Sequence, residues 1–563
     1  MNNIFVRGTI RSFAPLAIFV CLLQAGTMRA QSVITWHNDQ YRTGQNLKET
    51  ILTPANVNAS QFGKVFSYPV DGQIYAQPLY VPNVNITGKG KHNTLYVATE
   101  NDSVYAFDAD TPGAPLWFHN FTNPPTVLPI QNQNCVDPYC TVVPVIGITG
   151  TPVITPSTQT LYVVTRTQET TTGKLGYYTR LHALDIRSGA DKAGSPALIC
   201  GAPVNTPGCV FTQTTFNPKF SSQRSALLLL PFAGTAEGVL YIGFAGQSSL
   251  LAFDASTLAR LADWVVVPNI PVDPTTKGGI WGSGGGLAGD SLGNLYVSTG
   301  DGYFNVNAGG SDYGDSVIKL TLTPKAGGGF QFQVLDYFTP ADAACRGLND
   351  IDLGSGSPMI LPQQPGTSTN LLVIAGKGNI LCDPASPIEM VNRDAMGHFA
   401  GQLQAVAGAP GGYWGAPAYW DSAAGPYLYY AGQQGWNSGE YLRQYGLFHG
   451  QISPATSIAQ SPAKLLVGAT PSVSANGKTN GVVWAIERQE TLPVRPGSLP
   501  AILHAYSALN VATELYNSGM NPARDKAGVA SKFMVPTIIN GKVYVATQSE
   551  VDVYGLLPAG EIQ

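Results

Sequence analysis

The chain has 563 residues, including 63 Gly and 41 Pro, and only 12% of its residues are charged. Ordinary soluble domains have about 25% charged residues. A coiled coil or long-helix protein is excluded, because it needs abundant Ala, Glu, Lys and Leu, and an aromatic content of 10% argues against a disordered chain. The formal net charge is −4 without a basic tract, which argues against nucleic acid and anionic membranes as partners. We therefore expect a turn-rich all-β protein.

Residues 1–30 are typical of a signal peptide. Arg7 and Arg11 give a positive start, residues 13–23 are apolar, and Ala30 is a small residue suited to the position before a cleavage site. The alternative is a membrane anchor, but the apolar run has about 11 residues whereas a spanning helix needs roughly 20. We predict a secreted or periplasmic protein without an integral membrane segment, in which residues 31–563 form the mature chain.

Short β-rich runs recur along the rest of the chain at intervals of about 55 to 80 residues. Many follow a strand start with Gly or Pro, and several are followed by a third strand that ends in an Asp-containing turn. A repeat of this length with about four strands per unit predicts a β-propeller. The alternative is a string of unrelated β-sandwiches, which we disfavour because no linker separates the repeats. The eight runs are centred on Tyr96, Tyr162, Tyr241, Tyr296, Val373, Tyr429, Val483 and Tyr544.

The first and last predicted strands complement each other. The last repeat offers three strands, around residues 535–539, 543–547 and 551–556, and lacks a fourth. Residues 62–70 form a strand that has no repeat of its own. Pairing of this strand with the last repeat removes both exposed sheet edges. We therefore predict that residues 31–563 form a single eight-bladed β-propeller whose ring is closed by residues 62–70.

Six cysteines remain when Cys21 of the predicted signal peptide is set aside. An even number in an exported protein favours disulfides, although several connectivities are possible. A zinc site is the weaker alternative, because no Cys-x-x-Cys occurs and the histidines are scattered. The absence of a Cys-x-x-Cys-His sequence excludes covalent haem. Proximity in the sequence suggests the pairs Cys135–Cys140, Cys200–Cys209 and Cys345–Cys382.

One turn carries a resemblance to a known family. Residues 106–117 begin Ala-Phe-Asp-Ala-Asp-Thr-Pro-Gly and end at Trp117, and a looser copy runs from Ala252 to Trp264. This pattern resembles the tryptophan-docking repeat of quinoprotein dehydrogenases, which are eight-bladed propellers that carry pyrroloquinoline quinone (PQQ). The resemblance implies that the Trp packs between neighbouring blades. Four further segments are similar to those of secreted bacterial PQQ-like propellers, a subgroup without an assigned activity: residues 36–44, 52–57, 352–356 and 391–394.

The resemblance also implies a cofactor site with PQQ and Ca²⁺. Trp281 matches the Trp that lies flat under the quinone, Lys377 the basic residue that pairs with the quinone oxygens, and Thr149 a hydroxyl that contacts the cofactor. Glu169 and Asp301 match the family's calcium ligands. Asp301 replaces an Asn, and this change keeps an oxygen ligand suited to Ca²⁺. Each residue also has an ordinary structural interpretation, as a core, turn or solvated side chain.

Two departures from the family pattern bear on the reaction. Family members that oxidise alcohols use an Asp as the general base, and Thr321 stands in that position here. A Thr hydroxyl cannot act as a base near neutral pH. The family's adjacent pair of cysteines is also absent, because Cys135 and Cys140 are separated by four residues.

Two hypotheses follow. In the first, the protein is a PQQ- and Ca²⁺-dependent dehydrogenase of alcohols or sugars that passes electrons to a separate acceptor, since it has no haem site. In the second, it is a non-catalytic secreted propeller that binds a small-molecule or protein ligand on its loop-rich face. Thr321 favours the second hypothesis, and retention of Trp281, Lys377 and the carboxylates favours the first. Convergence of these residues in space would support the first.

Overall fold

The structure is a computed structural model in which residues 31–563 form one compact unit. It describes Met1 and residues 31–132, 142–204, 206, 208–211, 215–246, 248–269, 278–377, 382, 387–406, 415–432, 439–489 and 498–558. Residues 2–30 of the predicted signal peptide and the predicted Cys135–Cys140 pair lie outside these residues.

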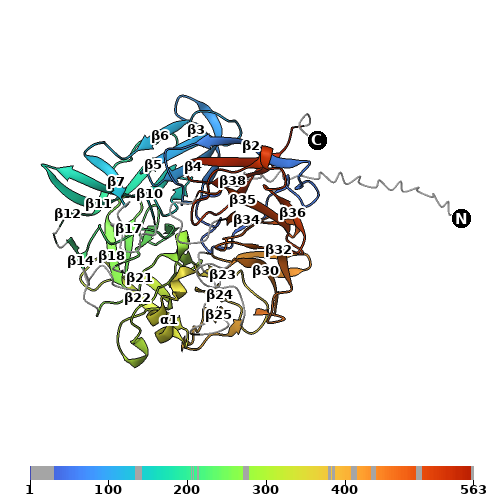
Figure 1. Ribbon diagram of the computed structural model, residues 1–563. Helices are drawn as coiled ribbons and strands as arrows, with labels where there is room; N and C mark the ends of the chain where they lie inside the picture. Colours follow the sequence, from blue (N-terminus) through green and yellow to red (C-terminus); the bar gives the residue numbers. More distant parts are fainter. Residues whose placement is uncertain are drawn as a thin grey trace. The chain divides into compact units, whose positions relative to one another are not determined.

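Eight sheets of at least four strands follow one another along the described part of the chain (Figure 1). We number them sheet 1 to sheet 8. Sheet 1 contains β3 (Leu79–Ile86), β4 (Gly90–Thr99), β5 (Ser103–Asp108) and β6 (Trp117–Asn120). Sheet 2 contains β9 (Val153–Thr155), β10 (Thr160–Thr171), β11 (Lys174–Asp185) and β12 (Ala197–Pro203), with β7 (Val127–Gln131) paired to β10 and β8 (Val145–Ile146) paired to β7. Sheet 3 contains β15 (Leu228–Leu230), β16 (Val239–Gly243), β17 (Ser249–Asp254) and β18 (Arg260–Val265). Sheet 4 contains β19 (Ala288–Gly289), β20 (Leu295–Ser298), β21 (Val317–Pro324) and β22 (Phe330–Thr339), with β26 (His398–Phe399) at its edge.

The second half of the chain continues the same arrangement. Sheet 5 contains β23 (Met359–Ile360), β24 (Leu371–Ile374), β25 (Ile388–Asn392) and β27 (Gln404–Val406). Sheet 6 contains β28 (Ala418–Ser422), β29 (Gly425–Tyr430), β30 (Glu440–Phe448) and β32 (Ala459–Leu465), with β31 (Gln451–Ile452) paired to β30. Sheet 7 contains β33 (Ser472–Asn476), β34 (Thr479–Arg488), β35 (Ala501–Ser507) and β36 (Glu514–Asn517), with β1 (Gln45–Asn46) beside β33. Sheet 8 contains β37 (Thr537–Ile539), β38 (Lys542–Ala546), β39 (Glu550–Leu556) and β2 (Phe62–Pro69).

The remaining described elements are short. β13 (Cys209–Val210) and β14 (Thr215–Phe216) form a two-stranded sheet. The helical segments are α1 (Ala343–Asn349), α2 (Pro522–Asp525), η1 (Gly282–Gly284), η2 (Val306–Ala308) and η3 (Leu353–Ser355). None of the helices in the described part of the chain has the length and apolar character needed to span a membrane. The all-β prediction is confirmed, and the succession of antiparallel four-stranded sheets is that of a β-propeller.

The repeated β-rich runs of the sequence are the second strands of the eight sheets. Tyr96 lies in β4 and Tyr544 in β38, for example, and the six other central residues occupy the corresponding strands. All eight are buried. A second strand is flanked on both sides within its sheet, and its two faces pack on the neighbouring sheets. The sequence of such a strand is therefore almost continuously apolar, and this explains why the second strands could be predicted from the sequence.

Successive sheets are joined by a recurring polar contact. A Tyr hydroxyl in the second strand of one sheet donates a hydrogen bond to the carbonyl oxygen of the residue directly after the third strand of the next sheet. These buried hydroxyls need a partner, and the turn carbonyl supplies one. Between sheets 4 and 5, the Lys319 ammonium donates to the corresponding carbonyl, that of Arg393, at 2.8 Å. The Tyr contacts are Tyr96–Ile186, Tyr162–Ala255, Tyr429–Ala508 and Tyr544–Ala109.

Trp117 packs between sheets 1 and 2, as the family resemblance implies. Its Nε1 donates a hydrogen bond to the carbonyl oxygen of Ile186 at 2.8 Å. Its ring lies against Gly189, where a Cβ atom would come within 2.5 Å of the indole. Gly189 also has a φ of 73°, a left-handed conformation that favours glycine. The turn after β11 therefore requires glycine for two independent reasons.

The strand predicted to complete the last repeat pairs with it. β2 runs antiparallel to β39, with Phe62 opposite Leu556 and Pro69 opposite Glu550, so strands from the two ends of the described chain lie side by side (Figure 1). Phe62 is fully buried, with its ring 5.4 Å from that of Trp484 and 5.0 Å from that of Tyr516. β2 thus gives sheet 8 its fourth strand and joins it to sheet 7 through side-chain packing.

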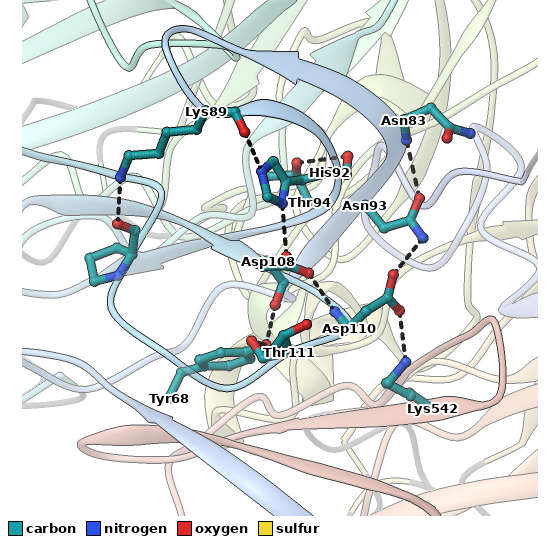
Figure 2. Close-up of polar contacts among 11 residues, drawn as sticks. Tyr68, Asn83, Lys89, His92, Asn93, Thr94, Asp108, Asp110, Thr111 and Lys542 are labelled. Carbon is teal, nitrogen blue, oxygen red and sulfur yellow. Dashed lines mark hydrogen bonds and ion pairs between the residues drawn. The ribbon is translucent and has the colours of Figure 1, made fainter.

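Sheet 8 also contacts sheet 1. Figure 2 shows the Lys542 ammonium beside the Asp110 carboxylate, at 2.8 Å, while Asn93 donates to the other oxygen of Asp110 at 2.7 Å. The hydroxyl of Tyr68, on β2, donates to the carbonyl oxygens of Asp108 and Thr111. The turn after β5 is therefore held from both sides, by its own sheet and by sheet 8.

Candidate functional site

Lys377 lies at the centre of the candidate site. It follows β24, and its side chain is buried. Its ammonium contacts the Asp352 carboxylate at 2.7 Å and the Asp350 carboxylate at 2.9 Å. Burial lowers the pKa of Lys377, but the charges of Asp352 and Asp350 outweigh this effect and hold the pKa above its usual value. Lys377 is therefore a fixed positive charge at neutral pH.

Asp301 joins the same group of side chains. It follows β20, and its backbone N–H donates a hydrogen bond to Oδ1 of Asp352 at 2.7 Å. Carboxylate oxygens of Asp301, Asp350 and Asp352 lie within 4.8 Å of one another. Burial opposes ionisation of Asp352, but Lys377 and the hydrogen bonds from Asp301 lower its pKa below the usual value. Asp352 is therefore a charged carboxylate, although it is buried.

Trp281 brings an aromatic surface to this cluster. It directly precedes η1, and the Lys377 ammonium lies 5.5 Å from the centre of its ring. The Arg224 guanidinium lies 4.7 Å from the same centre. Gly300 makes the close packing possible, because a Cβ atom there would lie 3.1 Å from Nε1 of Trp281 and 3.3 Å from Oδ1 of Asp352. Trp281 therefore offers a flat aromatic surface beside the Arg224 guanidinium and the Lys377 ammonium, on which a planar ligand can stack.

Thr149 belongs to a neighbouring cluster. Its hydroxyl donates to Oε2 of Glu100 at 3.1 Å, and the N–H of Gly147 donates to the same oxygen at 2.8 Å. Glu100 is fully buried, and this burial raises its pKa to about 7, although the hydrogen bonds and the charges of Arg166 and Arg224 act in the opposite direction. Arg224 thus connects Glu100 electrostatically with Trp281. Strongly shifted carboxyl groups of this kind gather at functional sites.

Glu169 and Thr321 lie elsewhere. Glu169 is on β10, where both of its carboxylate oxygens are bonded to the Arg180 guanidinium and one also accepts from Thr167. It is not a member of the Asp301 group. Thr321 is on β21 opposite Gln333. The structure therefore brings together Trp281, Lys377 and Asp301, with Thr149 next to them through Glu100 and Arg224.

Sequence reasoning missed four residues of this region: Glu100, Arg224, Asp350 and Asp352. One signal was present, because Glu100 and Lys377 each come four residues after the central residue of a second strand, Tyr96 and Val373. An ionisable side chain shortly after an apolar second strand could therefore have pointed to this region. Asp350 and Asp352 follow the short helix α1 rather than a repeated strand. Asp352 begins the segment 352–356 that resembles the family, but the resemblance implied no site role for it.

The chemistry of the side chains can be compared with what PQQ and Ca²⁺ would need; the structure does not bring the two predicted calcium ligands, Glu169 and Asp301, together. A planar quinone with several carboxylates matches an aromatic face flanked by Arg224 and Lys377. The calcium prediction required Glu169 and Asp301 together, but Glu169 is bonded to Arg180. In the Asp301 group, the Lys377 ammonium already lies against Asp350 and Asp352, where a cation would bind.

Two of the predicted disulfides are present in the described residues, Cys200–Cys209 and Cys345–Cys382. Cys345 is on α1, shortly before Asp350, and Cys382 follows Lys377 by five residues. The second disulfide therefore ties the segment that carries the Asp pair to the segment that carries the Lys.

No protein-family model matches the chain, and no curated protein matches it in sequence. The chain is similar in structure to the C-terminal WD40 domain of Sif2, with 8% identity, a TM-score of 0.43 and coverage of 91% of this chain and 100% of that chain. It is also similar to the Dos1 propeller, with 10% identity, a TM-score of 0.36 and coverage of 73% and 92%. A protein of unknown function from Bacteroides caccae has 11% identity, a TM-score of 0.25 and coverage of 61% and 94%.

Proposed function

We propose that the eight sheets are the blades of one closed propeller and that β2 closes its ring. The contact between sheets 8 and 1 supports this proposal. Tyr544 donates to the carbonyl oxygen of Ala109 at 2.9 Å, just as Tyr96 donates to that of Ile186 at 3.0 Å between sheets 1 and 2. If sheet 8 packs on sheet 1 in the same way as sheet 1 packs on sheet 2, the eight sheets form a closed ring.

We further propose that this propeller is a PQQ-dependent oxidoreductase of alcohols or sugars. A single observation carries the proposal: the Lys377 ammonium lies 5.5 Å from the Trp281 ring centre and 2.7 Å from the Asp352 carboxylate. Trp281 and Lys377 are far apart in the sequence, and each was matched to the quinone site separately. Because Trp281 and Lys377 lie close together beside the buried Asp352 carboxylate, they are suited to bind one ligand.

Each of these residues has a distinct task in the proposed reaction. When bound, PQQ supplies a two-electron acceptor for substrate oxidation. Trp281 would offer a flat surface for the ring system, and Arg224 and Lys377 would lie near its negative charge. Asp352 takes the role for which Thr321 is unsuited, because its charged carboxylate can accept the proton of a substrate hydroxyl. A separate electron acceptor would then be needed, since the sequence has no Cys-x-x-Cys-His site for covalent haem.

The proposal also includes export. The disulfides Cys200–Cys209 and Cys345–Cys382 favour an oxidising compartment, in agreement with the signal peptide expected from residues 1–30. Calcium is left out, because Arg180 already occupies both oxygens of Glu169.

The test combines PQQ binding with turnover. Purified protein is titrated with PQQ by calorimetry and quinone absorbance, and then assayed for dye-coupled oxidation of a panel of alcohols and sugars. We expect Trp281→Ala to lose PQQ binding, Asp352→Asn to bind PQQ but lose turnover by at least about a hundredfold, and Thr321→Ala to behave like the wild type. Absence of wild-type binding at about 50 µM PQQ would contradict the proposal.

A second candidate function is a non-catalytic propeller that binds a small molecule or a protein through its loops. The Glu169–Arg180 ion pair favours this alternative, because it removes a carboxylate that the family uses as a metal ligand. It predicts that PQQ binds without turnover of any substrate, or does not bind at all, while another ligand still protects the Trp281 region from solvent. Hydrogen exchange at that region would report such protection.

A further inference from the structure

Residues 33–46, which we name the N-terminal segment, contact all eight sheets. In each sheet the contact is with the first strand or with the residue directly before it. The contacts pass from sheet to sheet in nearly the order of the sequence, with Val33 at sheet 1 and Asn46 at sheet 8. Eight first strands that all bond to one short segment must lie around it. The bonded pairs, in sheet order, are Val33–Tyr80, Ile34–Ile154, Arg42–Leu227, Gln40–Gly289, Tyr41–Ile360, Thr43–Tyr419, Gly44–Val473 and Asn46–Ile538.

Six of these eight bonds join backbone atoms. A first strand pairs with the second strand of its own sheet on one side, so the backbone groups on its other edge need a different partner. In sheet 1, β3 pairs with β4, while Tyr80 exchanges two backbone hydrogen bonds of 2.9 and 2.7 Å with Val33. In sheet 6, the N–H of Tyr419 donates to the carbonyl oxygen of Thr43 at 2.9 Å. Pairing of an extended chain with strand edges is one of the recurring modes in which proteins bind peptides.

Arg42 fixes the N-terminal segment to sheets 3 and 4. Its side chain is fully buried, and burial lowers its pKa to about 10, so the guanidinium is still charged at neutral pH. Its Nε donates to the carbonyl oxygen of Leu287 at 2.8 Å and its Nη2 to that of Leu227 at 3.2 Å. Its Nη1 donates to the hydroxyl of Thr35 at 2.7 Å and to the carbonyl oxygen of Trp36 at 2.8 Å. The guanidinium therefore links two parts of the segment to each other and to the sheets.

Trp36 lies at the centre of the first strands. It is buried, and it forms one apolar cluster with residues that come two positions before the first strands of sheets 3, 6 and 8. These sheets are not consecutive, so an indole that packs with all three lies between them. His37 is fully buried beside Trp36, with 4.7 Å between the ring centroids, and its Nε2 lies 2.8 Å from the carbonyl oxygen of Pro471, directly before β33. The partners of Trp36 in the cluster are Ala226, Ala416 and Val535.

The N-terminal segment owes its bent shape to these surroundings. His37, Asn38 and Arg42 have φ values of 58°, 72° and 66°, in the left-handed region that is unfavourable for residues other than glycine. Such conformations persist only where the neighbouring structure holds them. Apart from the sheets the segment would lose this shape, and it would regain the shape on contact with them, as a peptide that folds on binding does.

A connection of residues 47–61 joins the N-terminal segment to β2. Within this connection Ala55 is exposed in a turn, and Lys48 is exposed close to the segment. The chain can therefore be cut at the turn without removing any of the eight bonds between the segment and the sheets.

We propose that the first strands of the eight sheets form a peptide-binding channel and that residues 33–46 are its built-in ligand. The channel selects an extended peptide by backbone pairing, and the buried side chains of Trp36, His37 and Arg42 make it specific. The intact protein closes its centre with its own chain, and a cut protein can exchange that peptide for another copy of it. The proposal goes beyond the proposed oxidoreductase and needs no PQQ, so its failure and the failure of that function are distinguishable.

The first experiment cuts the folded protein behind the N-terminal segment. A protease recognition sequence is inserted after Ala55, and the cut protein is analysed by gel filtration at falling concentration. We expect the fragment that ends at Ala55 to stay bound at about 1 µM, because its bonds to all eight sheets hold it. Release of the fragment at that concentration, with or without unfolding of the remainder, would overturn the proposal.

The second experiment locates the binding energy within the fragment. Arg42→Gln should weaken retention of the fragment by at least about a hundredfold, because the buried carbonyl oxygens of Leu287 and Leu227 lose a charged donor. Lys48→Gln is the matched control, since it also removes one positive charge but from an exposed side chain, and it should leave retention unchanged. Equal retention of the two variant fragments would show that residues 47–55 hold the fragment, and it would overturn the proposal.

The third experiment does not require a variant protein to fold. The cut wild-type protein is mixed with labelled synthetic peptides of residues 31–55, and their binding is followed by fluorescence anisotropy. The wild-type and Lys48→Gln peptides should replace the bound fragment, and the Arg42→Gln peptide should need a concentration at least about a hundredfold higher. Failure of the wild-type peptide to bind at about 100 µM would contradict an exchangeable peptide site.

Discussion

The hydroxyl of Tyr544 donates a hydrogen bond to the backbone carbonyl oxygen of Ala109, with 2.9 Å between the two oxygens and 435 residues between them in the sequence. The bond joins the last sheet to the first. Tyr96 makes the equivalent bond to Ile186, 90 residues away, between sheets 1 and 2. The two interfaces therefore use the same kind of donor and the same acceptor position at nearly equal distances, although their partners are separated very differently in the sequence.

The first prediction compares these two bonds. Tyr544→Phe removes the hydroxyl donor of the buried Ala109 carbonyl oxygen, which should lower the free energy of unfolding by about 1–2 kcal/mol. Tyr96→Phe should cost about 1 kcal/mol, because Nε1 of Trp117 still donates to the Ile186 carbonyl oxygen. Urea unfolding followed by fluorescence measures both changes. If Tyr96→Phe is destabilising and Tyr544→Phe is neutral, the interface between sheets 8 and 1 does not contribute to the folded state as proposed.

The second prediction concerns the strand that completes sheet 8. Phe62→Ala removes a fully buried ring that packs on Trp484 and Tyr516, and it should lower the free energy of unfolding by about 3–5 kcal/mol. Phe118, on β6, is 49% exposed and is the matched control, with an expected change within about 0.5 kcal/mol. Similar melting temperatures for the two variants would show that β2 is dispensable.

The third prediction follows from the raised pKa of Glu100. Its pKa is about 7 in the folded protein, compared with an ordinary value of 4.5. Between these pH values the folded state holds a proton that the unfolded state has lost, so this group makes stability fall as pH rises from 4.5 to 7. Glu100→Gln abolishes the titration while keeping an oxygen that can accept from Gly147 and Thr149.

Thermal and urea unfolding at about pH 4 and about pH 8 measure this effect. The free energy of unfolding of Glu100→Gln, relative to the wild type, should rise by about 3 kcal/mol between the two pH values. A difference that is the same at both pH values would contradict a protonated Glu100 in the folded protein.

The fourth prediction concerns the disulfide beside the candidate site. Replacing both Cys345 and Cys382 by Ala opens a closed segment of 37 residues and should lower the free energy of unfolding by about 4 kcal/mol. It should also weaken ligand binding at the Trp281 cluster, because the Asp350–Asp352 segment is no longer tied to the segment that follows Lys377. The Cys200–Cys209 double variant, with a separation of 9 residues, should cost about 3 kcal/mol and leave that binding unchanged.

The fold could be predicted from the sequence more completely than the candidate site. The second strand of a sheet, such as the strand around Tyr241, has a neighbouring strand on each side and is covered on both faces. Its residues are therefore almost all apolar, and the local sequence is enough to locate it. The strand that completes sheet 8 could also be predicted, because the last repeat lacked a strand and residues 62–70 had no repeat of their own. The structure places that strand at Phe62–Pro69.

The candidate site depends on contacts between loops of different sheets, which no local pattern records. The family resemblance located Trp281, Lys377 and Asp301, and the structure brings them together. It could not show that Glu169 is bonded to Arg180, because that pair forms across two strands of sheet 2. Nor did it give Asp352 a role, although residues 352–356 resemble the family, because the place of Asp352 depends on the packing of η3 against β20. These contacts are long-range and become visible only in three dimensions.

The pairing of β2 with β39 has a consequence for biosynthesis. β2 leaves the ribosome early, but its partner strand ends nearly 490 residues later, at Leu556. At about 5–20 residues per second, the two strands emerge roughly 25 to 100 s apart. Throughout this time the edge of β2 carries unpaired backbone groups that can recruit a strand from another chain. Chain elongation, rather than the folding of any one sheet, therefore sets the time at which sheet 8 can first form, and a holding chaperone would have its greatest effect on the N-terminal strand.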